Sequence, residues 1–286
     1  MKWEDRGRSK NLEDRRASGG PGRAVGGGAI PLGIGGIILV LVLSAVTGVD
    51  ILSLLGVSGT TTTSAPPATQ QSLEAEEQQV SFVSWVLDDV QGFWQATFER
   101  SSIQYPQARL VLYRDAVQSG CGVAPSAAGP FYCPTDQRVY LDLAFYDELH
   151  ARYGAPGDFA QAYVIAHEIG HHVQNVLGVL AESQRIQQTQ PGRASQASVA
   201  TELMADCYAG VWAAYADRNG VMERGDLEEG LRAAASVGDD TLAKRSGRIP
   251  NQETFTHGSA AQRQQWFTTG FQTGDPNACD TFSAGF

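Results

Sequence analysis

Positive charge is scarce in this sequence of 286 residues, which has 21 Lys and Arg against 31 Asp and Glu and a formal net charge of -10 at pH 7. Proteins that bind nucleic acid need basic side chains to neutralise phosphates, so this balance argues against nucleic acid as a partner. The four cysteines contain no Cys-x-x-Cys pair, which argues against a zinc site built from cysteines. There is no internal repeat, and the length suits one large domain with appendages or two small domains.

The few basic residues are concentrated at the amino terminus. Residues 1–28 hold seven Lys or Arg and four acidic residues, and the stretch is polar and glycine-rich. Such a composition cannot bury a hydrophobic core, so we predict a disordered basic tail over residues 1–28.

Charge is absent from residues 29–47, and apolar residues continue in patches to Val57. A helix of this length spans about 28 Å at ~1.5 Å per residue, close to the hydrocarbon thickness of a bilayer. We therefore predict a transmembrane anchor at residues 29–58, with the basic tail in the cytoplasm and the acidic remainder outside it. A cleaved signal peptide and a buried core helix are the alternatives.

The stretch from residue 59 to 72 is rich in Thr, Pro and Gln and is typical of a linker, so the folded domain is expected at residues 73–286. Strand-like runs cover residues 109–115 and 138–145, and a glutamine-rich helix end with a loop is expected over 182–198. Apolar spacing and capping signals predict helices at residues 74–100, 158–175, 196–218, 225–236, 239–246 and 260–272.

The predicted helix at 158–175 contains a metal-ligand motif, His167-Glu168-x-x-His171. Residues four apart share one face of a helix, so the two histidines can bind one metal ion together. Glu168 is placed to take a proton from a metal-bound water. The adjacent His172 points about 100° away and is interpreted as a surface or packing histidine.

A hydrolytic zinc site has three protein ligands and keeps one position for water. The candidates for the third ligand are Glu202, Asp206, His150 and His257. Glu202 and Asp206 are four apart on a helix that is expected to be largely buried, and buried carboxylates need partners. We predict that Glu202 binds the zinc and that Asp206 orients His167 through its second ring nitrogen.

Peptide hydrolysis also needs a cation or hydrogen-bond donor for the tetrahedral intermediate. His257 is our candidate, because it lies just before a helix with a capping-box signal at Ser259 and Gln262. The alternative is a structural histidine in a turn. A strand beside the metal helix could hold an extended peptide by main-chain pairing, and an ordinary sheet strand is the competing interpretation.

All four cysteines follow the apolar segment, and an even number fits two disulfides in an oxidising compartment. Cys121 and Cys133 would close a short loop rich in Pro and Gly, and Cys207 with Cys279 follows by elimination. Four buried free thiols are the alternative.

Short blocks of a characteristic sequence run through almost the whole chain. They are Lys2–Ser9, Asn11–Arg16, Gly129–Cys133, Val139–Asp142, His167–His172, Glu202–Cys207 and Thr256–Ser259. In this order they resemble a bacterial family of membrane-anchored neutral zinc metallopeptidases. The resemblance implies a zincin-like α+β fold with a Glu as third ligand, Zn2+ as the cofactor and a peptide or protein as substrate. The interval between His171 and Glu202 is longer than in the best-known zinc peptidases of the Glu class.

The leading prediction is thus a zinc metallopeptidase of the bacterial cell membrane that hydrolyses peptide bonds outside the cytoplasm. A non-proteolytic, zinc-stabilised binding or scaffold protein is the first alternative. Glu168 favours the enzyme, because a structural zinc site needs no general base. Zinc-dependent hydrolysis of a non-peptide amide, such as one in the cell wall, is the second alternative.

Overall fold

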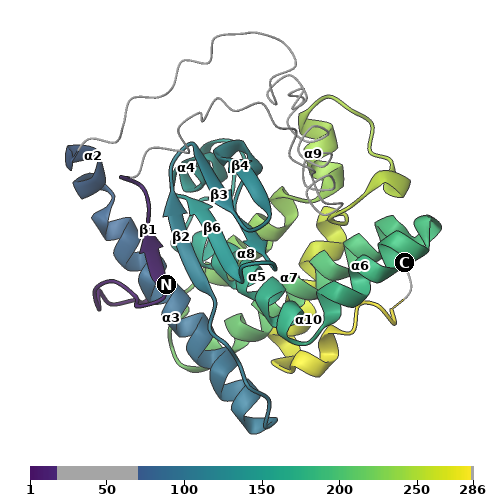
Figure 1. Ribbon diagram of the computed structural model, residues 1–286, viewed down its shortest axis with the longest axis horizontal. Coiled ribbons are helices and arrows are strands. Elements are labelled where there is room, and N and C mark those ends of the chain that lie inside the picture. The colour runs from purple at the N-terminus through teal and green to yellow at the C-terminus, as the bar shows by residue number, and fades with distance from the viewer. Residues whose placement is uncertain (18–69, 285–286) are drawn as a thin grey trace.

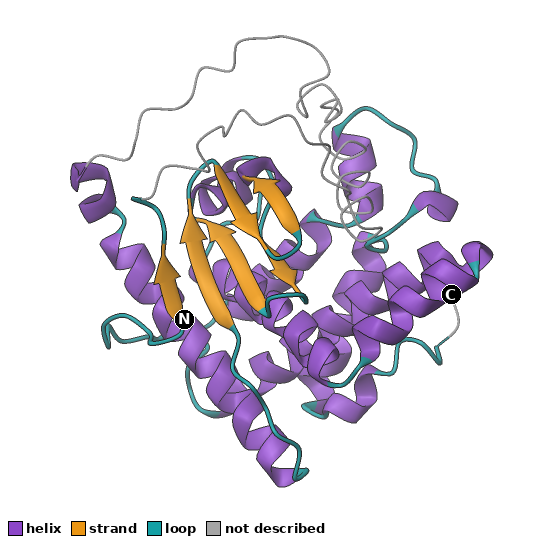
Figure 2. Cartoon of the chain, in the orientation of Figure 1, coloured by secondary structure: helices purple, strands orange, loops and turns teal. Residues whose placement is uncertain are grey.

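The computed structural model describes residues 1–17 and 70–284 and shows a mainly helical α+β fold (Figures 1 and 2). The helices are α2 Gln70–Ala75, α3 Glu77–Arg100, α4 Ala144–Ala151, α5 Asp158–Val176, α6 Val179–Thr189, α7 Ala194–Arg218, α8 Asp226–Ser236, α9 Asp239–Arg245 and α10 Ala260–Thr273. The strands are β1 Leu12–Asp14, β2 Arg109–Tyr113, β3 Ala116–Ser119, β4 Gly122–Pro125, β5 Phe131–Cys133 and β6 Arg138–Asp142.

The main sheet has the strand order β1-β2-β6-β5, and β3 and β4 form a separate antiparallel pair. β1, β2 and β6 run parallel to their neighbours, whereas β5 is antiparallel to β6. β5 therefore forms one edge of this sheet, next to the helix that carries the metal-ligand motif. Helix α5 contacts β5 and β6 as well as α3, α7 and α8, which places it in the middle of the fold.

Glycines set the distances between the three helices that build the site. A Cβ atom at Gly170 of α5 would lie 3.1 Å from the Ala205 carbonyl oxygen of α7. A Cβ atom at Gly210 of α7 would lie 2.1 Å from the Phe267 carbonyl oxygen of α10, and one at Gly270 only 2.0 Å from the Cys207 carbonyl oxygen. These helices pack backbone against backbone, and a larger residue at these positions would force them apart.

Most of the predicted helices are found. α5, α7, α8, α9 and α10 begin and end within two residues of their predicted limits, and the Ser259–Gln262 capping box of α10 is present. Over residues 182–198 the predicted helix end is found in α6, which continues to Thr189, but the predicted loop is shorter than expected, because α7 already begins at Ala194. The pattern also did not reveal α4 or the short strands β3, β4 and β5, which have three or four residues each.

The prediction of disorder was wrong for residues 1–17. β1 pairs with β2 in the register Leu12↔Leu110 to Asp14↔Leu112, and Trp3 makes an edge contact with the ring of Phe82 at 5.4 Å. Arg16 is buried, and its guanidinium donates hydrogen bonds to Asp14, Glu76 and Glu77. The charges that suggested a solvated tail therefore find partners on α3 and on the residue that precedes it.

Membrane association is the part of the prediction that lies beyond the described chain. The predicted anchor at 29–58 and most of the predicted linker at 59–72 fall outside the described residues. Within residues 1–17 and 70–284, none of the helices is long and apolar enough to cross a membrane.

Both predicted disulfides are present. Cys121–Cys133 joins the turn between β3 and β4 to the end of β5, and Cys207–Cys279 joins α7 to the short helical turn Pro276–Cys279. Cys207 directly follows Asp206 in the sequence. The second disulfide therefore links the carboxy-terminal segment to the part of α7 that faces His167 and His171.

Candidate active site

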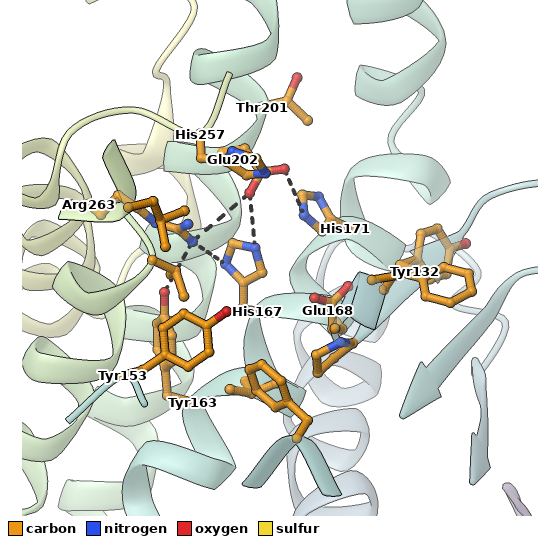
Figure 3. Close-up of a pocket in the computed structure, with 18 of the residues that line it drawn as sticks. Tyr132, Tyr153, Tyr163, His167, Glu168, His171, Thr201, Glu202, His257 and Arg263 are labelled. Carbon is orange, nitrogen blue, oxygen red and sulfur yellow. Dashed lines mark hydrogen bonds and ion pairs between the residues drawn. The ribbon is translucent and has the colours of Figure 1, made fainter. Parts of the chain in front are cut away.

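Two imidazoles and one carboxylate converge where α5 and α7 face each other. The Nε2 atom of His167 lies 3.3 Å from Glu202 Oε2, and the Nε2 atom of His171 lies 3.5 Å from Glu202 Oε1. Figure 3 shows the Glu202 carboxylate turned toward both histidines. Burial disfavours the charged carboxylate, but the neighbouring histidines hold the pKa of Glu202 well below its usual range. The structure thus brings together the three residues that we predicted as ligands.

The Nδ1 atoms of the two histidines form hydrogen bonds with side chains other than Glu202. His167 Nδ1 lies 2.9 Å from Asp206 Oδ1, and His171 Nδ1 lies 2.8 Å from Gln174 Oε1. Gln174 donates its own amide N–H to the Thr201 carbonyl oxygen, which leaves Oε1 to accept from His171. Both Nδ1 atoms therefore carry a proton, so the Nε2 atoms, which face Glu202, are the ring nitrogens that would bind a metal.

This donor set fits Zn2+. Two imidazole nitrogens and a carboxylate oxygen are the protein ligands of one common class of catalytic zinc site. In the described residues, the ligand atoms of His167, His171 and Glu202 lie within 4.8 Å of one another. Asp158, Asp226 and Glu229 form a second group of this kind, but the Met1 ammonium lies 2.7 Å and 3.3 Å from the first two.

Asp206 accepts hydrogen bonds from three other side chains. Besides His167, it accepts from the Tyr163 hydroxyl and from Arg263, whose Nε and Nη2 lie 2.8 Å and 2.9 Å from its two oxygens. Burial favours the neutral acid, but Arg263 and His167 hold the pKa of Asp206 below its ordinary value. Desolvation raises the pKa of Tyr163 well above its ordinary value, so its hydroxyl remains a donor. Asp206 is therefore an anion in contact with Nδ1 of His167, and its role in orienting this ring toward a metal stays a prediction.

The sequence-based prediction missed Tyr163 and Arg263. Tyr163 lies four residues before His167 and hence on the same face of α5, a spacing that could have drawn attention to it. Arg263 is the single charged residue of α10 and is only 3 % exposed. A lone charge in an otherwise neutral helix is a sign of a buried ion pair, but nothing local identifies its partner 57 residues away.

His257 lies at the other side of Glu202, beside α9. Its Nδ1 atom is 3.1 Å from Asp239 Oδ1, and the second Asp239 oxygen accepts the backbone N–H groups of Thr256, His257 and Gly258. Burial disfavours the imidazolium, but Asp239 and Glu202 outweigh it and raise the pKa of His257. The ring is therefore more readily protonated than a free imidazole. Asp239 was also missed, because its role depends on how the start of α9 meets the segment Thr256–Gly258.

Two further histidines, His172 and His150, lie outside the site. His172 is fully buried and lies between the Pro106 carbonyl, which accepts from Nε2, and the Tyr132 hydroxyl, 2.9 Å from Nδ1. It is a packing histidine that does not face Glu202, in agreement with the prediction. His150, one of the open candidates for the third ligand, is exposed on α4 and lines a different pocket with Tyr146 and Gln161.

A cleft of about 400 Å³ opens beside the three converging residues. Its lining includes Glu168, His257 and Arg263 together with residues of the edge strand β5. Glu168 is 8 % exposed, and desolvation by burial raises the pKa of its carboxyl. Figure 3 places Glu168 between His167 and Tyr132, on the side of the cleft nearest to β5. The arrangement offers a base, a cation and a set of metal donors to one bound molecule.

Similarity to known proteins extends over the whole chain. A family model described as "Putative neutral zinc metallopeptidase" matches residues 1–282. An uncharacterized protein of Escherichia coli, YpfJ, is 44% identical over 291 residues, which cover 99% of each chain. An uncharacterized protein of Mycobacterium tuberculosis is 50% identical over 191 residues, 63% of this chain and 64% of that one. No solved structure matches the chain.

Proposed function

The chain belongs to the family described as "Putative neutral zinc metallopeptidase", and we propose that it is a zinc-dependent peptidase whose reaction takes place at His167, His171 and Glu202. The observation that carries the proposal is the convergence of these side chains at one end of a cleft that also contains Glu168. A purely structural metal site needs neither a buried base nor an adjacent cleft.

Each residue has a separate task in this proposal. Zinc, when bound, would supply a Lewis acid that polarises the substrate carbonyl and makes water acidic enough to react near pH 7. Glu168 takes the proton from the attacking water and passes it to the leaving amine. His257, held by Asp239, provides the positive charge that stabilises the oxyanion of the tetrahedral intermediate. Asp206 keeps His167 in the tautomer that leaves Nε2 available.

The edge strand β5 supports a peptide as the substrate. In the main sheet, β5 pairs with β6 along one side and lies at the edge of the sheet. Residues Pro130, Phe131 and Tyr132 line the cleft. An extended peptide laid along β5 would make main-chain hydrogen bonds whatever its sequence, and its scissile bond would pass close to Glu168.

The two disulfides support a location outside the cytoplasm. Disulfides persist in oxidising compartments and are rare in the reducing cytosol. The chain has two of them, Cys121–Cys133 and Cys207–Cys279, and no free cysteine. We propose that the folded domain works in an extracytoplasmic compartment, with residues 29–58 as the segment that associates with the membrane.

The proposal is tested with the purified full chain, Glu168→Gln, and the exposed carboxylate variant Glu182→Gln as matched control. All three should bind about one zinc ion per chain. The wild type and Glu182→Gln should cleave an unfolded protein, whereas Glu168→Gln should lose about 100-fold or more in kcat/KM. Zinc binding by the wild type without cleavage of any protein or peptide would favour the binding or scaffold alternative. Cleavage of a non-peptide amide alone would favour the second alternative, a hydrolase of non-peptide amides.

A further inference from the structure

One wall of the cleft is made of apolar side chains from parts of the chain that are distant in sequence. These are Phe145, Tyr153, Val164, Val237 and Leu242, which we call the apolar wall. Val164 lies one helical turn before His167 on α5, so the wall begins directly beside the metal donors. The rings of Phe145 and Tyr153 are 6.1 Å apart, and Arg245 of α9 donates to the Tyr153 carbonyl oxygen. These contacts hold α9, and with it Leu242, against the same end of the cleft.

The apolar wall is not part of the closed core. Phe145, Tyr153, Val237 and Leu242 are each only partly buried, so they present hydrocarbon surface to the cleft. Most ionisable residues among the described residues that line the cleft belong to the candidate active site: His167, Glu168, His171, Glu202, His257 and Arg263. Glu148 is the remaining charged side chain in this lining. Glu148 is exposed at the rim and pairs with Arg152 at 3.6 Å. A charged group that entered the apolar wall would lose hydration without finding a partner there.

We propose that the apolar wall selects substrates with a large aliphatic or aromatic residue next to the scissile bond. This inference rests on the proposed peptidase function and names the substrate class for the same site. Burial of a Leu or Phe side chain contributes about 1.5–3 kcal/mol relative to exposure. The expected preference over Ala at that position is therefore roughly 10- to 100-fold in kcat/KM, and Asp, Glu and Lys are disfavoured.

The test uses quenched fluorescent peptides that differ at one residue on either side of a single cleavable bond. The wild-type full chain should cleave the Leu and Phe peptides roughly tenfold or more faster than the Ala peptide, and the charged peptides more slowly still. Leu242→Asp should reduce cleavage of the Leu peptide and improve that of the Lys peptide. Ile249→Asp is the matched control, because Ile249 is 93 % exposed and absent from the cleft lining. It should retain the wild-type preference.

Peptide affinity for zinc-loaded Glu168→Gln, measured by calorimetry, separates the two hypotheses. Tighter binding of the Leu and Phe peptides without cleavage by the wild type would support the apolar wall and contradict the peptidase. Cleavage or binding with no preference for large apolar residues would overturn the inference. An unchanged preference in Leu242→Asp would also overturn the inference. The same conclusion would follow if none of the peptides in the series bound.

A second inference comes from a different observation, the position of residues 1–17. Leu110 N–H donates to the Asn11 carbonyl oxygen, and Arg15 N–H donates to the Leu112 carbonyl oxygen. Hydrogen bonds therefore join the chain to β2 just before and just after β1. The N–H of Lys2 donates to the carbonyl oxygen of Val221, in the loop that follows α7. Residues 1–17 are thus part of the same folded body as residues 70–284.

A strand cannot be separated by a membrane from the strand with which it pairs. We infer that residues 1–17 and 70–284 lie on the same side of the membrane, so both flanks of the apolar stretch at 29–58 are on that side. This differs from the single-pass orientation expected from charge alone, in which the amino-terminal tail is cytoplasmic and the domain is outside. The disulfides place the shared side in the oxidising compartment.

Cysteine labelling in intact cells tests this arrangement. Lys10→Cys and Ile249→Cys each add one exposed thiol, one in the amino-terminal segment and one in the domain. A membrane-impermeant maleimide, given access to the outer face of the inner membrane, should label both without lysis. The wild type, whose four cysteines are paired, supplies the background. Labelling of Ile249→Cys before lysis and of Lys10→Cys only after it would overturn the inference. Protection of both until lysis would support a common side but contradict the oxidising compartment.

Discussion

The Nδ1 atom of His167 lies 2.9 Å from Oδ1 of Asp206, and this contact joins the motif on α5 to the acidic residues on α7. It determines which ring nitrogen of His167 is free. Because Asp206 also holds Arg263 and Tyr163, the histidine is oriented by a buried group of three side chains rather than by a single partner.

The first prediction concerns this contact. Asp206→Asn removes the anion that fixes the His167 tautomer, so zinc affinity should fall about 10- to 100-fold. Competition with a chromophoric chelator measures the change directly. Asp217→Asn, at an exposed position on the same helix, is the control and should leave zinc affinity unchanged. Equal affinities for the wild type and Asp206→Asn would show that Asp206 does not orient the ligand.

Arg263 should matter more for stability than for the number of zinc ions bound. Arg263→Gln leaves the Asp206 carboxylate buried without its bidentate partner, and removal of one member of a buried ion pair costs about 3–5 kcal/mol. Urea unfolding of the zinc-free chains should show this loss. Arg232→Gln, which changes an exposed arginine on α8, should remain within about 0.5 kcal/mol of the wild type. A similar free energy of unfolding for all three proteins would contradict a buried, energetically coupled pair.

The pH dependence of activity should report the His257–Asp239 contact. Asp239 favours the imidazolium and raises the pKa of His257, so activity that depends on the charged ring is present at lower pH and lost as the pH rises through that pKa. Asp239→Asn removes the negative charge, so the pKa should fall and the alkaline limb of kcat/KM should move to lower pH. In His257→Gln the same limb should be absent and kcat reduced. An alkaline limb at the same pH in wild type and Asp239→Asn would exclude this role for the pair.

Removal of zinc should lower the thermal stability, because the three donors come from both α5 and α7. Ligand that binds only the folded state stabilises it by RT ln(1 + [L]/Kd), about 4 kcal/mol at 1,000 times Kd. Differential scanning calorimetry with and without a chelator should therefore show a lower Tm for the metal-free wild type. Glu202→Ala should show little response to zinc over the same concentrations, and its metal content should fall. A zinc response equal to that of the wild type would remove Glu202 from the ligand set.

Several parts of this site can be predicted from local spacing alone. The spacing of His167 and His171 requires a shared helical face, because the α-helix repeats every 3.6 residues. The same period places Glu202 and Asp206 together, and the burial expected for their helix implies that these carboxylates need partners. The capping box at Ser259 and Gln262 is equally local, since both of its hydrogen bonds form within one turn.

Other parts could not be obtained in this way. Asp239 and Arg263 are ordinary charged residues in their local sequence, and their roles appear only when α10 packs against α7 and α9 packs against α8 and α10. Residues 12–14 form a strand because β2 offers them an unpaired edge, and their own composition gives little indication of it. The prediction of disorder failed there for this reason: it considered the charges of the tail without their partners.

The amino-acid sequence is thus sufficient to predict which residues come together as candidate metal donors and base, through spacings that depend on the local period of a helix. Tertiary packing is needed to establish which atoms of those residues are free, which charges surround them and which surface the substrate meets. Packing also makes residues 1–17 part of the domain. These features depend on contacts between segments that are distant in the chain, and such contacts are selected by the packing of the whole chain rather than by local preference.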